Sequence, residues 1–395
     1  MKLANRIHRI QPSATLEMTA KAAELKSKGV EVFNMSVGEP DFNTPSNIIN
    51  AAIEAMNSGH TRYTPGAGTQ SLKHAIQQKL MRDNHLDYNL EEIIVSSGGK
   101  HSLYNACQAL FQAGDEVIIF SPYWVSFPDF VSVTGATPVF VKTNPTKQYE
   151  PIFDELESKI NSNTKGIIIN SPSNPTGGVW SDEAIKRTID IARSNNIWVF
   201  SDECYEQLTY DLPFKSTYQL CPDYDKILTF QSCSKTYAMT GWRIGYTCGN
   251  KDVIKAMSKL QGQSTSCPNS IAQFAATEAL LGDQSSVKNM KAAFKIRRDL
   301  IVNRLNSMDG ISCDIPGGAF YVFPDISNLI NRNVCGKIIK SALDLCLVLL
   351  ESQSVVSVAG NSFGANHNIR FSYATSEDTI NEAMNRLEKI ILDCN

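Results

Sequence analysis

The residues most suited to take part in a reaction lie in one short stretch, from Ser232 to Gly245. Lys235 follows Ser232 by three residues and precedes Arg243 by eight, and the apolar segments on either side are typical of buried strands. A lysine in a connection between two core strands could form a Schiff base with an aldehyde. A surface-loop lysine is the common alternative. The spacing also matches the S-x-x-K pattern of serine acyl enzymes, but their Ser-Asp-Asn and Lys-Thr-Gly partner motifs do not occur in this sequence.

Three further candidates follow other strand-like segments. The run Gly98-Gly99-Lys100 opens a predicted helix, where free backbone N–H groups and the helix dipole favour a phosphate. Trp124 could stack on a flat ring. Asp202 ends a segment too apolar to hold an unpaired charge cheaply, so a protonated ring nitrogen would suit it as a partner. Tyr205 lies near the same face. Each candidate also has an ordinary structural explanation, respectively a tight turn, a core tryptophan and a helix N-cap.

The elements that must position these residues are strands of one sheet. Seven apolar segments alternate with helical stretches, near residues 92–96, 116–120, 138–141, 166–170, 197–201, 227–230 and 243–246. Uninterrupted apolar strands are typical of a sheet buried on both faces, and their alternation with helices predicts a mostly parallel α/β sheet. Ligands of such sheets bind beyond the carboxyl ends of the strands. Because the candidates follow such ends, the sequence predicts one shared site.

The length of the chain and the change in its pattern of predicted helices and strands predict two domains. The 395 residues suffice for a large domain and a smaller one. We expect residues 1–45 to form an N-terminal arm and part of the small domain, with a helix near 14–28 and a strand near 30–36. Residues 46–281 are predicted to form a large domain, with a mostly parallel seven-stranded sheet sandwiched by helices. Residues 282–395 are predicted to form a smaller α+β domain.

Composition argues against several classes of protein. A net charge of -3 gives no sign of affinity for nucleic acid or membranes. The ten cysteines form no CxxC pair and no cluster at zinc spacing, which argues against a disulfide framework and a metal site. No apolar run approaches the ~18 residues of a membrane helix. We therefore expect a cytoplasmic protein. A Rossmann dinucleotide site is rejected because Gly66-Ala-Gly-Thr-Gln-Ser follows no strand and lacks the third glycine.

Taken together, the motifs resemble those of the class I (fold-type I) pyridoxal-phosphate aminotransferases, and within them the bacterial aspartate aminotransferases of the 1b (class Iγ) subgroup. The resemblance runs nearly from end to end. It rests on Val37-Gly-Glu-Pro-Asp-Phe, Tyr63-Thr-Pro-Gly-Ala-Gly, Ser121-Pro-Tyr-Trp-Val-Ser, Asn170-Ser-Pro-Ser-Asn-Pro-Thr-Gly, Ser201-Asp-Glu-Cys-Tyr, the stretch from Ser232 to Gly245, and Arg370-Phe-Ser-Tyr-Ala.

The resemblance implies a role for each candidate residue. Lys235 would hold pyridoxal 5'-phosphate as a Schiff base and serve as acid and base, and Asp202 would keep the ring nitrogen protonated. The other cofactor contacts would be Gly99, Lys100, Trp124, Asn174, Tyr205, Ser232 and Arg243, with Tyr63 contributed by a partner subunit. The substrate contacts would be Gly38, Lys100, Trp124, Asn174 and Arg370, whose planar fork would bind the α-carboxylate.

The resemblance also implies a reaction, namely amino transfer between L-aspartate and 2-oxoglutarate by a homodimer with shared sites. Lys100 favours an acidic substrate, because this lysine is associated with the distal carboxylate in the subgroup. Gln11 stands where members that also accept prephenate tend to carry a lysine, so we expect weak or absent prephenate activity. Two alternatives stay open: an aminotransferase of aromatic or broad specificity, and a non-catalytic cofactor-binding regulator. The presence of Lys235, Asp202 and Arg370 argues against the regulator.

Overall fold

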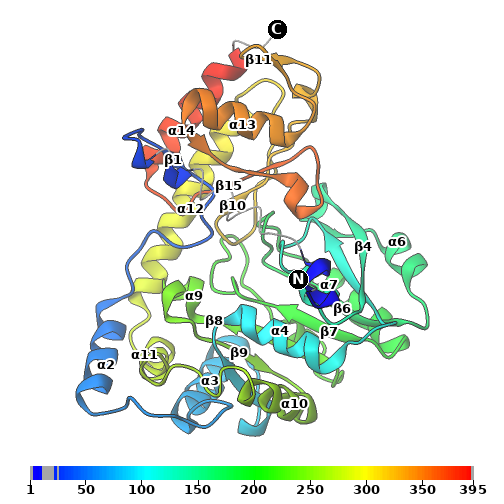
Figure 1. Ribbon diagram of the computed structural model, residues 1–395, viewed down its shortest axis with the longest axis vertical. Helices are drawn as coiled ribbons and strands as arrows, with labels where there is room; N and C mark the ends of the chain where they lie inside the picture. The colour runs from blue at the N-terminus through cyan, green and yellow to red at the C-terminus, as the bar shows by residue number, and fades with distance from the viewer. Residues whose placement is uncertain (1–2, 11–21, 25, 393–395) are drawn as a thin grey trace.

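The computed structural model describes residues 3–10, 22–24 and 26–392 (Figure 1). Its central sheet has eight strands in the order β2-β9-β8-β7-β6-β3-β4-β5. Their bounds are β2 Ile93–Ser96, β3 Glu116–Ser121, β4 Thr137–Asn144, β5 Glu150–Pro151, β6 Thr164–Asn170, β7 Trp198–Asp202, β8 Ile227–Ser232 and β9 Gly245–Cys248. Strands β4, β3, β6, β7 and β8 pair in parallel, whereas β9 is antiparallel to both of its neighbours. The predicted mostly parallel α/β sheet is confirmed.

The seven predicted strands are all present, and the two-residue strand β5 adds an eighth at one edge. The prediction was wrong about where the last strand begins. It was expected from residue 243, but β9 begins at Gly245. Arg243 has a left-handed backbone with φ of 58°, which cannot continue a strand. As a result, Arg243 lies in the connection rather than in the sheet.

Helices cover both faces of the sheet because its strands are apolar on both sides. In β6, Ile168 belongs to one hydrophobic cluster, whereas Ile167 and Ile169 belong to the cluster on the opposite face. The helices of this part are α2 Ser46–Asn57, α3 Gln70–Asn84, α4 Gly99–Leu110, α5 Phe127–Ser132, α6 Phe153–Lys159, α7 Asp182–Ser194, α8 Thr217–Leu220, α9 Cys233–Thr236, α10 Lys251–Gly262 and α11 Ser270–Leu281. Short 3-10 turns cover Asn5–Arg9, Leu90–Glu92, Pro145–Lys147 and Thr240–Trp242.

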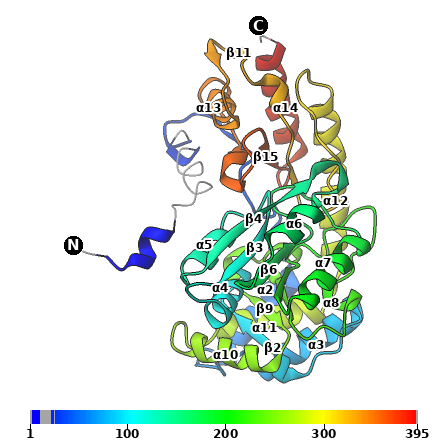
Figure 2. The ribbon, with the colours of Figure 1, turned by 90° about the vertical axis from the view of Figure 1, so that its right-hand side faces the viewer.

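The long helix α12, Ser285–Asn306, leads from the sheet to a second group of elements (Figure 1). That group has α13 Ala342–Gln353 and α14 Glu377–Leu392, and Figure 2 shows these helices gathered with β15 above the large sheet. A three-stranded antiparallel sheet has the order β10-β15-β14, from Tyr321–Val322, Ile369–Ser372 and Val358–Ala359. A hairpin joins β11 Asn333–Val334 to β12 Lys337–Ile338, and 3-10 turns cover Ser327–Leu329 and Gly360–Phe363.

The strand near the start of the chain joins this second group. Strand β1, Phe33–Asn34, is shorter than predicted and pairs in parallel with β13, Val355–Val356. Most of the helix expected near 14–28, and Gln11 itself, lie outside the described residues. The division of the chain at residues 45 and 281 stays a prediction. In the described ranges, no helix is both long enough and apolar enough to cross a membrane.

Candidate active site

A cavity of about 360 Å³ lies where the parallel strands β6, β7 and β8 end. Asn170, Asp202 and Ser232, the last residues of these strands, all line it. The cavity brings together every site residue predicted from the sequence except Tyr63: Gly38, Gly99, Lys100, Trp124, Asn174, Asp202, Tyr205, Ser232, Lys235, Arg243 and Arg370. Tyr63 lies elsewhere on the surface, where its side chain is 90% exposed.

Lys235 enters the cavity from α9, the short helix that directly follows β8. The Ser232 hydroxyl caps this helix by accepting a hydrogen bond from the Ser234 amide at 3.1 Å. Lys235 Nζ donates to the Gly38 carbonyl. Burial lowers the pKa of Lys235, which favours the neutral and nucleophilic amine.

Asp202 is a buried acid at the end of β7. The Cys204 amide donates to its Oδ1 at 3.3 Å. Burial nevertheless raises the pKa of Asp202 to about 7, since desolvation outweighs this hydrogen bond and the Lys235 charge. A cationic ring nitrogen bound beside Asp202 would restore its negative charge.

A candidate anion cradle lies at the start of α4. Gly98 has φ of 91°, and a Cβ there would lie 2.3 Å from Arg243 Nη2. A Cβ at Gly245 would lie 2.3 Å from the Gly99 nitrogen. Glycine is therefore required at both positions for the helix start, the Arg243 guanidinium and β9 to come this close. Helix N–H groups beside an arginine and the Ser232 hydroxyl suit a phosphate.

Arg370 of β15 is a buried cation. Its Nη1 donates to Asn174 Oδ1 at 2.9 Å and its Nη2 donates to the Ser36 carbonyl at 2.6 Å. Its Nε finds no hydrogen-bond partner among the described residues. Its guanidinium carbon lies 4.7 Å from the centre of the Tyr321 ring. Burial lowers the pKa of Arg370, but a guanidinium stays charged at neutral pH, so this group can receive a carboxylate.

Among the cavity residues that were not predicted as site residues, Tyr321 and Asn170 contact predicted ones. The Tyr321 hydroxyl lies 2.9 Å from that of Tyr205, and both rings are buried. Asn170 accepts the Asn174 amide at 2.8 Å and donates to the Asp202 carbonyl at 3.2 Å, so it ties two predicted site residues together. Asn170 could have been found, since it ends a predicted strand. Tyr321 gave no signal, because it lies in an apolar run far along the chain.

Comparisons with known proteins agree with this geometry. The family model described as aminotransferase class I and II matches residues 30–387. The chain belongs to this family. It is therefore a pyridoxal-phosphate-dependent aminotransferase, as the sequence motifs predicted.

The most informative similarities extend over the whole chain. A probable aspartate/prephenate aminotransferase of Rhizobium leguminosarum bv. phaseoli is 46% identical over 396 residues, covering 99% of both chains. An aspartate aminotransferase of Bacillus sp. (strain YM-2) is 43% identical, covering 98% of this chain and 99% of that one. The crystal structure of the Rhizobium meliloti aspartate aminotransferase has a TM-score of 0.96 at 40% identity and covers all of both chains. That of Thermus thermophilus aspartate aminotransferase with maleate has a TM-score of 0.93 at 38% identity, covering 99% of this chain and 100% of that one.

The side chains that line the cavity of this aminotransferase are chemically complementary to the family's cofactor. Pyridoxal phosphate carries a phosphate, an aldehyde and a basic ring nitrogen. The cradle at Gly99 and Arg243 suits the phosphate, the Lys235 amine suits the aldehyde, and the acid Asp202 suits the ring nitrogen. Each of the three groups thus has a complementary partner in one cavity.

Proposed function

We propose that the protein is an aspartate aminotransferase, which transfers the amino group reversibly between L-aspartate and 2-oxoglutarate. The observation that carries this proposal is the presence of two cations, Arg370 and Lys100, in the cavity that also holds Lys235. Two cations suit a substrate with two carboxylates. The relatives named aspartate aminotransferase support the same substrate, as does the similarity to the Thermus thermophilus structure with maleate, which is a dicarboxylate.

We assign the cofactor contacts as follows. Pyridoxal phosphate, when bound, supplies an electrophilic carbon and an electron-withdrawing ring. The α4 N-terminus at Gly99, Lys100, Ser232 and Arg243 would hold its phosphate. Asp202 would accept a hydrogen bond from the ring nitrogen, Tyr205 and Asn174 would hydrogen-bond the ring oxygen, and Trp124 would stack on the ring.

We further propose a cytoplasmic homodimer, in which Tyr63 of one copy reaches the phosphate bound to the other copy. The exposure of Tyr63 in the single chain is compatible with that role.

Three basic side chains of the cavity would act on the substrate. Arg370 would bind the α-carboxylate, with Asn174 and the Gly38 backbone completing that pocket. Lys100, whose Nζ lies 5.0 Å from the centre of the Trp124 ring, would bind the distal carboxylate. Lys235 Nζ would remove the proton from the substrate Cα and act as the acid in the return step, for which its lowered pKa is suited.

A half-reaction screen tests the proposal. Each amino acid is added separately to the cofactor-loaded protein, and the loss of the near-visible absorbance band is followed. Aspartate and glutamate are expected to react fastest. Faster reaction with aromatic amino acids would favour an enzyme of other specificity, and no reaction with any amino acid would favour the non-catalytic regulator.

Prephenate is expected to be a poor substrate or none, because the neutral Gln11 cannot pair with its extra carboxylate. Relatives of this chain include proteins named for aspartate alone and proteins named for aspartate and prephenate. Prephenate turnover is compared for the wild type and Gln11→Lys, with aspartate as the reference substrate. Robust prephenate transamination by the wild type would contradict the prediction.

A further inference from the structure

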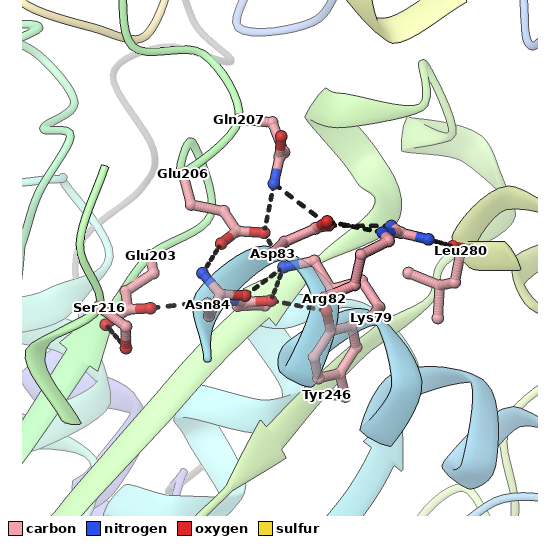
Figure 3. Close-up of polar contacts among 11 residues, drawn as sticks. Lys79, Arg82, Asp83, Asn84, Glu203, Glu206, Gln207, Ser216, Tyr246 and Leu280 are labelled. Atoms are coloured by element: carbon pink, nitrogen blue, oxygen red, sulfur yellow. Dashed lines mark hydrogen bonds and ion pairs between the residues drawn. The ribbon is translucent and has the colours of Figure 1, made fainter. Parts of the chain in front are cut away.

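The turn that follows β7 presents side chains to two different places. Asp202 and Tyr205 line the cavity. Glu203 and Glu206 are also buried, but neither lines the cavity. The Glu203 carboxylate lies beside Gln231 of β8, and the Glu206 carboxylate lies beside α3 (Figure 3). The Glu206 amide donates to the Glu203 carbonyl at 3.0 Å, which closes the turn. A displacement of either glutamate would therefore move the two cavity residues as well.

Lys79 of α3 holds the side of the turn that faces away from the cavity. It is 1% exposed, and its Nζ donates to Glu206 Oε1, to Asn84 Oδ1 at 2.8 Å and to Gln231 Oε1 at 2.9 Å (Figure 3). Asn84 in turn donates to Glu206 Oε2 at 2.6 Å. All three ammonium protons of Lys79 and both oxygens of Glu206 are thereby engaged.

Gln231 extends the cluster to the neighbouring strand end. Its Oε1 also accepts the Tyr246 hydroxyl at 2.6 Å, and its Nε2 donates to Glu203 Oε2 at 3.4 Å. Gln231 directly precedes Ser232, which lies in the cradle. One buried cluster therefore includes Glu203, which directly follows Asp202, and Gln231, which directly precedes Ser232.

The cluster holds two carboxylates, and a buried carboxylate needs a cation. Burial and the neighbouring Glu206 charge raise the pKa of Glu203 to about 7. The Ser216 hydroxyl and the Thr217 amide donate to Glu203 Oε1 at 2.8 and 3.0 Å, but they carry no charge. Lys79 supplies the positive charge, so its removal would leave Glu206 buried without a counter-ion.

We propose that Lys79 is a positioning residue for the cofactor site, whose ion pair with Glu206 fixes the directions in which Asp202 and Tyr205 enter the cavity. This inference rests on the proposed function, because those two residues are assigned there to the cofactor ring. Without the pair, the turn would shift so that the Glu206 carboxylate could reach water. Even a displacement of about 1 Å is costly at a reacting centre.

The experiment compares Lys79→Met with Lys73→Met. Lys73 lies on the same helix and is also buried, and it makes no hydrogen bond or ion pair with residues 202–206 in the described part of the chain. For each protein we would titrate pyridoxal phosphate into the apoprotein and follow the near-visible band. The dissociation constant and the pH midpoint of that band are the readouts. Lys79→Met is expected to raise the dissociation constant about tenfold or more and to shift the midpoint. Lys73→Met is expected to leave both close to wild type.

Two further variants distinguish an effect of Lys79 on the position of the cavity residues from an effect on protein stability. They also test the inference if Lys79→Met does not fold. Asn84→Ala keeps both charges and should shift both readouts in the same direction by less. Lys79→Met/Glu206→Leu removes both charges and should regain thermal stability, while cofactor binding stays weak. The inference is overturned if the readouts of the Lys79→Met and Asn84→Ala variants match those of Lys73→Met, or if the double variant regains wild-type affinity and midpoint. A wild-type protein that develops no band with pyridoxal phosphate would instead refute the proposed function.

Discussion

Arg370 Nη1 donates to Asn174 Oδ1 at 2.9 Å, although the two residues are 196 positions apart in the chain. This bond joins β15 of the small sheet to the connection that follows β6 of the large sheet. Because Asn174 holds one arm of the guanidinium, the fork has a fixed orientation before any substrate arrives. A preorganised fork loses less conformational entropy when it binds a carboxylate.

Replacing this fork should damage substrate binding and leave cofactor binding intact. In Arg370→Lys the charge is kept, but an ammonium cannot make two parallel hydrogen bonds to a carboxylate. We expect kcat/KM for aspartate to fall about a hundredfold, which corresponds to about 3 kcal/mol. Steady-state kinetics checks this, with the affinity for pyridoxal phosphate as the internal control. An unchanged kcat/KM would mean that the substrate carboxylate binds elsewhere.

Lys100 should matter most for substrates with a second carboxylate. In Lys100→Met, kcat/KM for aspartate is expected to fall about tenfold, since one charge-assisted hydrogen bond is lost. Alanine has no distal carboxylate, so its slow half-reaction should change much less. The ratio of the two rates is the measurement, because any weakening of cofactor binding affects both substrates. Equal losses for aspartate and alanine would assign Lys100 to the phosphate alone.

Gly98 should tolerate no side chain. In Gly98→Ala the new Cβ would collide with Arg243 Nη2, and φ of 91° is unfavourable for alanine. Gly114→Ala is a matched control, since its φ is 96° and nothing lies within 4 Å of its Cβ position. Both variants are expected to lose about 1 kcal/mol of stability because of the positive φ, and Gly98→Ala is expected to lose more because of the collision. Only Gly98→Ala should also weaken the binding of pyridoxal phosphate, measured by titration of the apoprotein. Equal affinities in the two variants would contradict the assignment of the cradle.

The ligand-free protein should become less stable between about pH 4 and pH 7 because of Asp202. Its pKa is about 7 in the folded chain, against about 3.9 in an unfolded one. The folded state therefore binds more protons in this window, and the free energy of unfolding falls as the pH rises. Asp202→Asn removes this contribution.

Urea unfolding of both apoproteins across this pH range is the measurement. Relative to wild type, Asp202→Asn should gain stability as the pH rises, by up to about 4 kcal/mol. Glu203, whose pKa is also about 7, titrates in both proteins and cancels in the difference. A stability difference that does not change with pH would show that the Asp202 carboxyl is not desolvated.

The strand ends could be predicted from the sequence because they follow a local rule. Each uninterrupted apolar run stops at a polar residue, and parallel strands bring residues such as Asp202 and Ser232 to one edge of the sheet. Arg370 and Tyr63 carry no such pattern, and only the family resemblance singled them out. The contact of Tyr321 with Tyr205 and that of Lys79 with Glu206 join residues 116 and 127 positions apart. No periodicity in one segment encodes such pairs, because they depend on how distant elements pack.

The pairing of β1 with β13 also sets the order in which the site can be assembled during synthesis. The Phe33 and Met35 amides donate to the Ser354 and Val356 carbonyls at 3.0 and 2.9 Å, and the Ser372 amide donates to the Met35 carbonyl at 2.7 Å. The segment beyond these residues provides the Ser36 carbonyl for Arg370 and the Gly38 carbonyl for Lys235. Residues 33–38 can therefore reach their final positions only after residues 354–372 have been synthesised. Residues as far along the chain as Ser372 must therefore be synthesised before Lys235 can meet all of the neighbours described here.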